Sequence, residues 1–410
     1  MLTNLESNFE ELIKKQNIQN FDIRKKLLKK FIKEGFPDKN TEDWKFSDFN
    51  KIINLKFPNL NINFGLDKKK LLIKNQILNN FEHNKIILAN GELIEIDLSF
   101  ENKDEVQIAQ FDKRNDFQIN KNTLLDLNEA LSLKYLDIKI SNNYKFKKPL
   151  VIYHLRNESL NSKIINLNIN FTLGENSSLC LVNNFNDDNE SNFINLKYNF
   201  ELSKDSNLKN YLVDGQNNNN ARYLFININQ KNNSNSENFI FSKGSNFFKT
   251  EIFSNLYGEY SSSFINGIIY LENEKHHEIK TNINHLSANT KSYQLIKNVL
   301  KDKSRGIYQG KIFVDQIAQK TDGYQLSKTL LLDKSTEFNG KPELEIYADD
   351  VKCSHGSTSG NLDEEAIYYL MSRGISYDQS KKLLIDGFLL EVLNKITDEN
   401  IKKYLTNLIN

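Results

Sequence analysis

Hydrophobic positions at the start of the chain recur with a helical period. Apolar side chains form two stripes within the first 50 residues, at Leu5, Phe9, Leu12 and Ile13 and at Phe21, Leu27, Leu28, Phe31 and Ile32. Gly35 and Pro37 follow the second stripe, as residues that end helices do. We therefore expect a mainly helical region over residues 1–83, although the pattern between residues 50 and 80 is too weak to predict an element.

From about residue 84 the hydrophobic period changes to two, which predicts β-strands. The dipeptide Asn90-Gly91 between two apolar runs is typical of a tight turn. From residue 133 onward the apolar runs lie at 135–140, 150–154, 164–173, 179–183, 194–202, 224–228, 239–241, 264–271, 307–314 and 330–332. No helical pattern of about 10 to 15 residues separates them before residue 360, which argues against βαβ units and leaves a sandwich, barrel or solenoid.

A small repeat favours a solenoid. Apolar residues six positions apart flank polar, small-residue segments at 173–179, 202–208 and 332–338. The stacked coils of a β-helix need such corners, because each coil covers the apolar side of its neighbour. Hairpins in a sandwich could produce the same spacing, so the repeat favours a β-solenoid core over residues 84–360 without excluding the sandwich.

The helical period returns over residues 361–410, which predicts a small helical module. Ser376 and Gln379 have the spacing of a capping box, and Thr397 is placed to cap a last helix. The longest apolar stripe contains Leu383, Leu384, Phe388, Leu389, Val392, Leu393 and Ile396. Within that stripe Phe388, Leu389 and Val392 could face either the core of the module or a partner protein.

Composition narrows the function classes. The net charge is +1, so no global field attracts nucleic acid or an anionic membrane. Two cysteines, Cys180 and Cys353, are too few for a disulfide framework or for a four-cysteine metal site within this chain. No apolar run approaches the roughly 18 to 20 residues of a spanning helix, and the N-terminus does not resemble a signal peptide. We expect a cytoplasmic protein without a membrane or nucleic-acid partner.

The strongest candidate for chemistry is the pair Cys353 and His355, which precedes a predicted turn over residues 356–360. On an extended strand, residues two apart point to the same face, so thiol and imidazole would emerge side by side. A soft sulfur beside a neutral nitrogen suits iron or zinc. Two ligands do not complete a site that needs four, so a second chain would have to supply the others. A buried cysteine and a hydrogen-bonded histidine at a strand end would have the same spacing.

Other constellations favour catalysis less. Cys353 and His355 could act as nucleophile and base, but no third orienting group is identifiable. Asp349 and Asp350 could be acid/base carboxylates of a β-helical carbohydrate lyase or hydrolase, although such a pair is more often part of a solvated strand end or turn. The histidines His276, His277 and His285 are interpreted as solenoid surface or core residues. The glycines of 356–360 lack the lysine of a phosphate-binding loop, so nucleotide hydrolysis would belong to a partner.

Longer stretches around these residues carry a family resemblance. They read KPELEIYADDVKCSHG at 341–356, LDEEAIYYLMSRGI at 362–375, SRGIYQGKIFV at 304–314, AQKTDGYQ at 318–325 and EDWKF at 42–46. Together they resemble the SufB/SufD family of the SUF iron–sulfur cluster assembly complex, and the Cys-Ser-His-Gly form resembles its SufD branch. Ser357 and Ser359 depart from the family, which usually has Ala and Val at those positions.

The resemblance implies a fold and a set of partners. It implies a right-handed parallel β-helix with helical N-terminal and C-terminal parts, paired with a SufB-like paralogue and with a SufC-like ATPase docked on the C-terminal helices. A nascent iron–sulfur cluster would form at the paralogue interface, with His355 and Cys353 as candidate ligands and Phe388, Leu389 and Val392 as candidate docking residues. The chain would be a non-catalytic scaffold, and the resemblance leaves open a flavin in the complex and a homodimer of the isolated chain. The alternative function is a β-helical carbohydrate-active lyase or hydrolase.

Overall fold

The computed structural model describes residues 2–16, 20–62, 77–112, 122–155, 161–185 and 191–409. Its helices are α1 Leu2–Gln16, α2 Phe21–Glu34, α3 Phe49–Lys56, α4 Thr123–Leu131, α5 Glu364–Ser372, α6 Tyr377–Leu393 and α7 Glu399–Ile409, with short 3₁₀ turns at Glu42–Trp44 and Lys103–Glu105. Its first strands are β1 Asn61–Ile62, β2 Asn84–Ala89, β3 Glu92–Asp97, β4 Val106–Phe111, β5 Tyr135–Ile140 and β6 Leu150–Leu155. The longer strands are β7 Lys163–Leu173, β8 Ser178–Asn184, β9 Phe193–Leu202, β10 Asn207–Asp214, β11 Ala221–Gln230, β12 Asn235–Ser242, β13 Phe247–Leu256, β14 Ser262–Leu271, β15 His276–His285, β16 Lys291–Leu300, β17 Arg305–Val314, β18 Thr321–Leu331, β19 Glu337–Ile346 and β20 Val351–Gly360.

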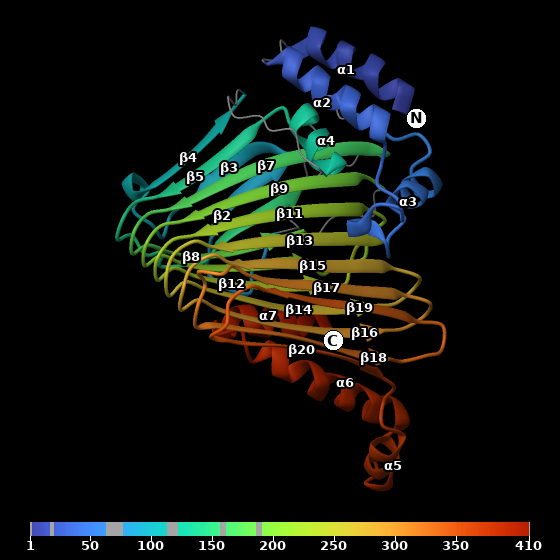
Figure 1. The fold of residues 1–410 in the computed structure, drawn as a ribbon. Helices are drawn as coiled ribbons and strands as arrows, with labels where there is room; N and C mark the ends of the chain where they lie inside the picture. Colours follow the sequence, from blue (N-terminus) through green and yellow to red (C-terminus); the bar gives the residue numbers. More distant parts are fainter. Residues whose placement is uncertain are drawn as a thin grey trace.

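The strands form a parallel β-solenoid of about seven turns, which confirms the predicted fold class (Figure 1). From β5 onward, successive strands alternate between two 10-stranded sheets, in the orders β19-β17-β15-β13-β11-β9-β7-β5-β4 and β20-β18-β16-β14-β12-β10-β8-β6-β2-β3, with β1 paired to β7. Only the outermost pairs at the first end, β2 with β3 and β4 with β5, are antiparallel among the described strands. Each coil therefore lies in register on the coil before it.

The predicted corners lie between consecutive strands. The segment 173–179 joins β7 to β8, 202–208 joins β9 to β10, and 332–338 joins β18 to β19. Asn176 and Asp205 turn the first two corners with φ angles of 53° and 58°. Asn and Asp tolerate this left-handed conformation because their short polar side chains can bond locally, which explains the polar composition of these segments. Inside the corners, alternate side chains of both sheets fill one continuous apolar core.

Helices cover the outer faces of the two sheets. The N-terminal helices and α4 pack on the starts of β7, β9, β11 and β13, while α6 and α7 pack on the outer face of the other sheet (Figure 1). Helix α4 was not predicted, because Leu124 to Leu131 are all buried and present no amphipathic stripe. Helix α3 falls in the stretch where the pattern was too weak to predict an element, and residues 63–76 of that stretch lie outside the described part. The three predicted regions, 1–83, 84–360 and 361–410, stay a prediction.

The C-terminal caps agree with the sequence at one helix and differ at the next. The capping box of Ser376 and Gln379 is present at the start of α6, as predicted. At α7 the prediction was wrong, because Asp398, and not Thr397, accepts the free amides of Asn400 and Ile401. The hydroxyl of Thr397 instead accepts a hydrogen bond from Lys209 on β10.

Candidate functional site

The solenoid ends in an open coil formed by β19 and β20. Each is the terminal strand of its sheet, so in the described chain β19 pairs with β17 alone and β20 with β18 alone. The predicted turn over residues 356–360 is wrong, since β20 continues through Gly360 and Ser357, Thr358 and Ser359 pair residue by residue with β18. The ladder hydrogen bonds outweigh the conformational freedom of the two glycines. Both strands leave one edge with free main-chain N–H and C=O groups.

Cys353 and His355 lie on this last coil. Cys353 is in register with Gly323, and His355 is in register with Gln325. Both β18 residues are buried, so these positions belong to the inward-facing set of the sheet. Cys353 is half-buried beside Ile312, Val314 and other small apolar residues, whereas His355 is exposed. The pair is therefore not sealed inside the molecule, because no further coil covers it in the described chain.

The electrostatics of Cys353 argue against a reactive nucleophile. Burial raises the pKa of its thiol, and the main-chain N–H of Gly323 opposes that shift. A Cβ atom on Gly323 would lie 3.4 Å from the Cys353 sulfur, so the thiol rests directly on the preceding coil. A thiol with a raised pKa is mostly protonated at neutral pH and reacts slowly.

No group of three or more His, Cys, Asp or Glu side chains in the described part of the chain could hold a metal ion. The histidines outside the pair are satisfied in place. His277 bonds the hydroxyl of Ser242 and the carbonyl of Ser245, and His285 bonds Thr290 and Ser292. Both are fully buried, in agreement with the interpretation of core histidines. The pair at the open end thus has no third such ligand grouped with it in the described part of the chain.

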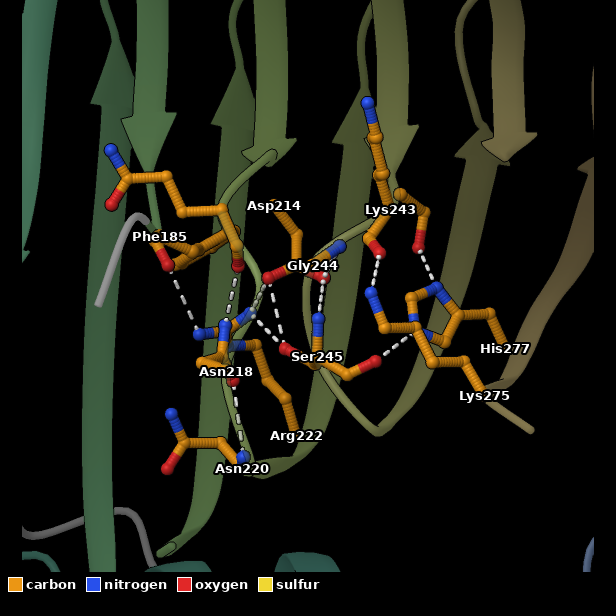
Figure 2. A network of polar contacts seen from close by, with 12 residues as sticks. Phe185, Asp214, Asn218, Asn220, Arg222, Lys243, Gly244, Ser245, Lys275 and His277 are labelled. Atoms are coloured by element: carbon orange, nitrogen blue, oxygen red, sulfur yellow. Dashed lines mark hydrogen bonds and ion pairs between the residues drawn. The ribbon is translucent and has the colours of Figure 1, made fainter. Parts of the chain in front are cut away.

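His277 belongs to a buried polar network that sequence reasoning missed (Figure 2). Arg222 on β11 forms an ion pair of 2.5 Å with Asp214 on β10, and Ser245 donates to the same carboxylate. Asp214 and Arg222 are eight residues apart across a corner, a spacing that neither strand periodicity nor a motif marks. The network joins three successive coils and is a structural element of the solenoid.

The candidate acid/base pair lies in a corner. Asp349 and Asp350 are exposed between β19 and β20, and the main chain of Asp350 bonds Lys320 and Gln319 of the corner below. Both carboxylates therefore lie on a solvated turn.

The C-terminal docking residues need a correction. Leu389 and Val392 are 0 % exposed and pack on the solenoid, and the ring of Phe388 lies 4.4 Å from the Lys297 ammonium. Leu389 and Val392 therefore hold α6 on the sheet and are not available to a partner, whereas Phe388 is partly exposed and stays a candidate docking residue. Helix α5 instead projects beyond the last coil (Figure 1) and exposes Tyr368 by 76 % and Tyr369 by 58 %. The helical period of the sequence identifies an apolar stripe on α6, but it does not show whether that stripe packs within this chain or faces a partner.

The fold and the open end define a class of protein. It is a helix-flanked parallel β-solenoid whose last coil is covered by no further coil of the described chain and carries Cys353 and His355. The chain belongs to the family described as SUF system FeS cluster assembly, SufBD core domain, whose model matches residues 156–388, more than half of the chain.

Curated relatives agree with this family. The chain is similar to the iron–sulfur cluster assembly protein SufD of Escherichia coli, 34 % identical over 148 residues that cover 36 % of this chain and 35 % of the relative. It is similar to SufD of Bacillus subtilis, 28 % identical over 155 residues that cover 38 % and 36 %. A SufBD family protein of Synechocystis is 32 % identical over 123 residues, covering 30 % and 26 %. The matched part thus spans about a third of each relative's length or less. Among the described helices, none is long and apolar enough to cross a membrane.

Proposed function

We propose that the chain is a non-catalytic scaffold subunit of a SUF iron–sulfur cluster assembly complex. It joins a SufB-like paralogue end to end, and a nascent cluster forms at the joint with His355 and Cys353 among its ligands. The observation that carries the proposal is the open last coil, where two unpaired strand edges and the thiol–imidazole pair coincide. That this happens in the cytoplasm stays a prediction.

Incomplete ligation suits a site of assembly. A cluster bound by four strong ligands of one chain would be retained, whereas a cluster shared between two chains can be released when the joint changes. Free strand edges provide the means of joining, because a second solenoid can add its own terminal strands to each sheet. The cluster is then cargo of the complex and not a resident cofactor.

A SufC-like ATPase would dock on the C-terminal helices. Tyr368, Tyr369 and Met371 expose a large apolar area on α5, as protein interfaces rich in Tyr and Met do. Helix α6 is fixed to the solenoid through Leu389 and Val392. Movement of docked ATPase subunits would therefore reach the open coil through a rigid element. A flavin in the complex stays a prediction.

The test is His355→Ala in the complex reconstituted with the ATPase and the SufB-type paralogue. We expect the three chains to co-elute as before, while the visible absorbance of an assembled cluster is lost, because an exposed ligand is removed without touching the core. Ser354→Ala is the matched control, since Ser354 lies on the same strand but on its other face. Normal cluster formation by His355→Ala would refute the role of this residue.

A further inference from the structure

A groove of about 520 Å³ lies on the outer face of the second sheet, away from the thiol–imidazole pair. Three aromatic residues line it in register on consecutive strands, namely Phe264 on β14, Tyr293 on β16 and Tyr324 on β18. The rings of Tyr293 and Tyr324 are stacked with centroids 5.2 Å apart and planes at 27°. The link between α6 and α7 forms the opposite wall through Lys395 and Thr397. The groove is thus built by one chain and needs no partner.

The file of three rings ends at Tyr324 on β18, one strand before β20, which is the last strand of the sheet. The next position in register after Tyr324 is Ser354 on β20, and Gly356 follows it on the same face of that strand. In the described chain, the ring of Tyr324 therefore has no aromatic neighbour on the side of the open coil. Aromatic rings are stabilised by offset stacking, and Tyr324 stacks on a neighbouring ring, that of Tyr293, on one side only. A flat ligand ring can stack there or lie along the file.

The charged side chains around the groove favour a negatively charged ligand. Lys291 on β16 is in register with Asp322 on β18, and the Lys395 ammonium lies 5.2 Å from the centre of the Tyr293 ring. Lys209 lies beside them, bonded to Thr397 and 4.0 Å from Glu237. The lining and this neighbour therefore carry three ammonium groups against the carboxylates of Glu237 and Asp322. A negative group beside the middle ring, Tyr293, meets the ammonium groups of Lys395 and Lys291.

From this geometry we propose that the groove binds a small planar aromatic molecule that carries a negative charge. The ring lies on the Phe264–Tyr293–Tyr324 file, and the anion lies against Lys395 and Lys291. This site is separate from cluster assembly, since none of its lining residues is Cys353 or His355. Its occupancy would stabilise the attachment of the α6–α7 link to the solenoid.

The test uses naphthalene-2-sulfonate as the probe and follows its fluorescence on titration with the full chain. Naphthalene-2-sulfonamide has the same ring without the charge, and cyclohexanesulfonate has the charge without the flat ring. We expect saturable binding of the sulfonate, and weaker binding of both analogues in competition. Equal binding of all three compounds, or no saturable binding of the sulfonate, would overturn the proposal.

Variants locate the binding. Tyr324→Leu should weaken the sulfonate by roughly threefold to tenfold, because it removes a stacking ring while keeping apolar bulk. Lys395→Gln should weaken it by about twofold to fivefold and leave the sulfonamide unchanged. The matched controls are Tyr347→Leu and Lys231→Gln, both exposed at corners of the solenoid outside the groove. Lys395 is on the surface, so its variant keeps the test informative even if Tyr324→Leu unfolds. Equal effects of the groove variants and their controls would place the probe elsewhere and contradict the proposal.

Discussion

At the scale of single residues, the solenoid depends on charges that it has removed from water. Burial alone would raise the pKa of Asp214, but the charge of Arg222 and the hydrogen bonds from Ser245 hold the pKa of this carboxyl below its usual range. The carboxylate is therefore ionised in the core and neutralises the guanidinium beside it (Figure 2). A buried ion pair of this kind adds little stability compared with apolar residues in the same place. Removing only one partner is costly, because the other charge is then left buried and unpaired.

Asp214→Asn should consequently lower the free energy of unfolding by about 3 to 5 kcal/mol, because a buried guanidinium loses its counter-charge. The measurement is the midpoint and slope of denaturant unfolding. Glu337→Gln is the matched control, since Glu337 pairs with Arg305 at 3.0 Å on the surface of the same solenoid, and its loss should cost less than about 1 kcal/mol. Similar losses in the two variants would show that the buried network has no special role.

Buried histidines make the fold sensitive to acid. Burial lowers the pKa of His277 to about 4 and that of His285 to about 3, whereas both are near 6.5 in an unfolded chain. Between those values the unfolded state binds protons that the folded state does not, so their contribution is complete above about pH 6.5 and is lost as the pH falls below it. Each histidine adds a slope that approaches roughly 1.4 kcal/mol per pH unit.

We expect His285→Gln to reduce the loss of unfolding free energy between about pH 7 and pH 5, because one of these two proton-binding groups is removed. The measurement is denaturant unfolding of the variant and the parent at several pH values. The comparison concerns the slope with pH and not the stability itself, so a uniform destabilisation by the substitution does not affect it. An unchanged slope would contradict the assignment.

At the scale of elements, α6 and α5 have different roles. The apolar stripe of α6 attaches this helix to the solenoid, and the exposed side chains of α5 form the proposed docking surface. Leu389→Ala should destabilise the chain by about 2 to 5 kcal/mol, because it opens a cavity where α6 packs on the solenoid. Tyr368→Ala should leave the unfolding free energy unchanged and weaken capture of the SufC-like ATPase in a pull-down. A Tyr368 variant that binds the ATPase normally would remove α5 from the proposed docking surface.

The elements also show how far the sequence could lead. Period-two runs and repeated polar corners are local signals, so the strands, the corners and the solenoid were predictable. Helix α4 was not, because burial of Leu124 to Leu131 on all sides erases the helical stripe. The turn predicted at Gly356 and Gly360 was wrong, because their pairing with β18 is a long-range effect that local turn preferences do not reveal. Cys353 and His355 were found through spacing, but their position on an open coil follows only from the order of all the coils.

At the scale of the whole molecule, the two ends of the solenoid differ. The first end is closed by antiparallel pairs, β2 with β3 and β4 with β5, and by the N-terminal helices (Figure 1). The last end is covered by no described element, although α5 lies beyond it. Natural sheet proteins protect free edges unless the edges serve to pair. The outer face of β20 is nearly bare, with Ser354, Gly356 and Thr358 in alternate positions.

An exposed end of this kind predicts that the isolated chain associates with a second copy when no paralogue is present. Ser357 points inward and shares a hydrogen bond of 2.9 Å with Ser327, whereas Thr358 points outward on the same strand. Ser357→Lys would place a charge in the mouth of the coil, where an incoming coil must stack, and inward-pointing charges block pairing of edge strands. Sedimentation velocity should then show a reversible dimer for the parent chain and for Thr358→Lys, and a monomer for Ser357→Lys. A dimer that survives Ser357→Lys would mean that copies meet through another surface, and the end-to-end joint proposed for the paralogue would lose its support.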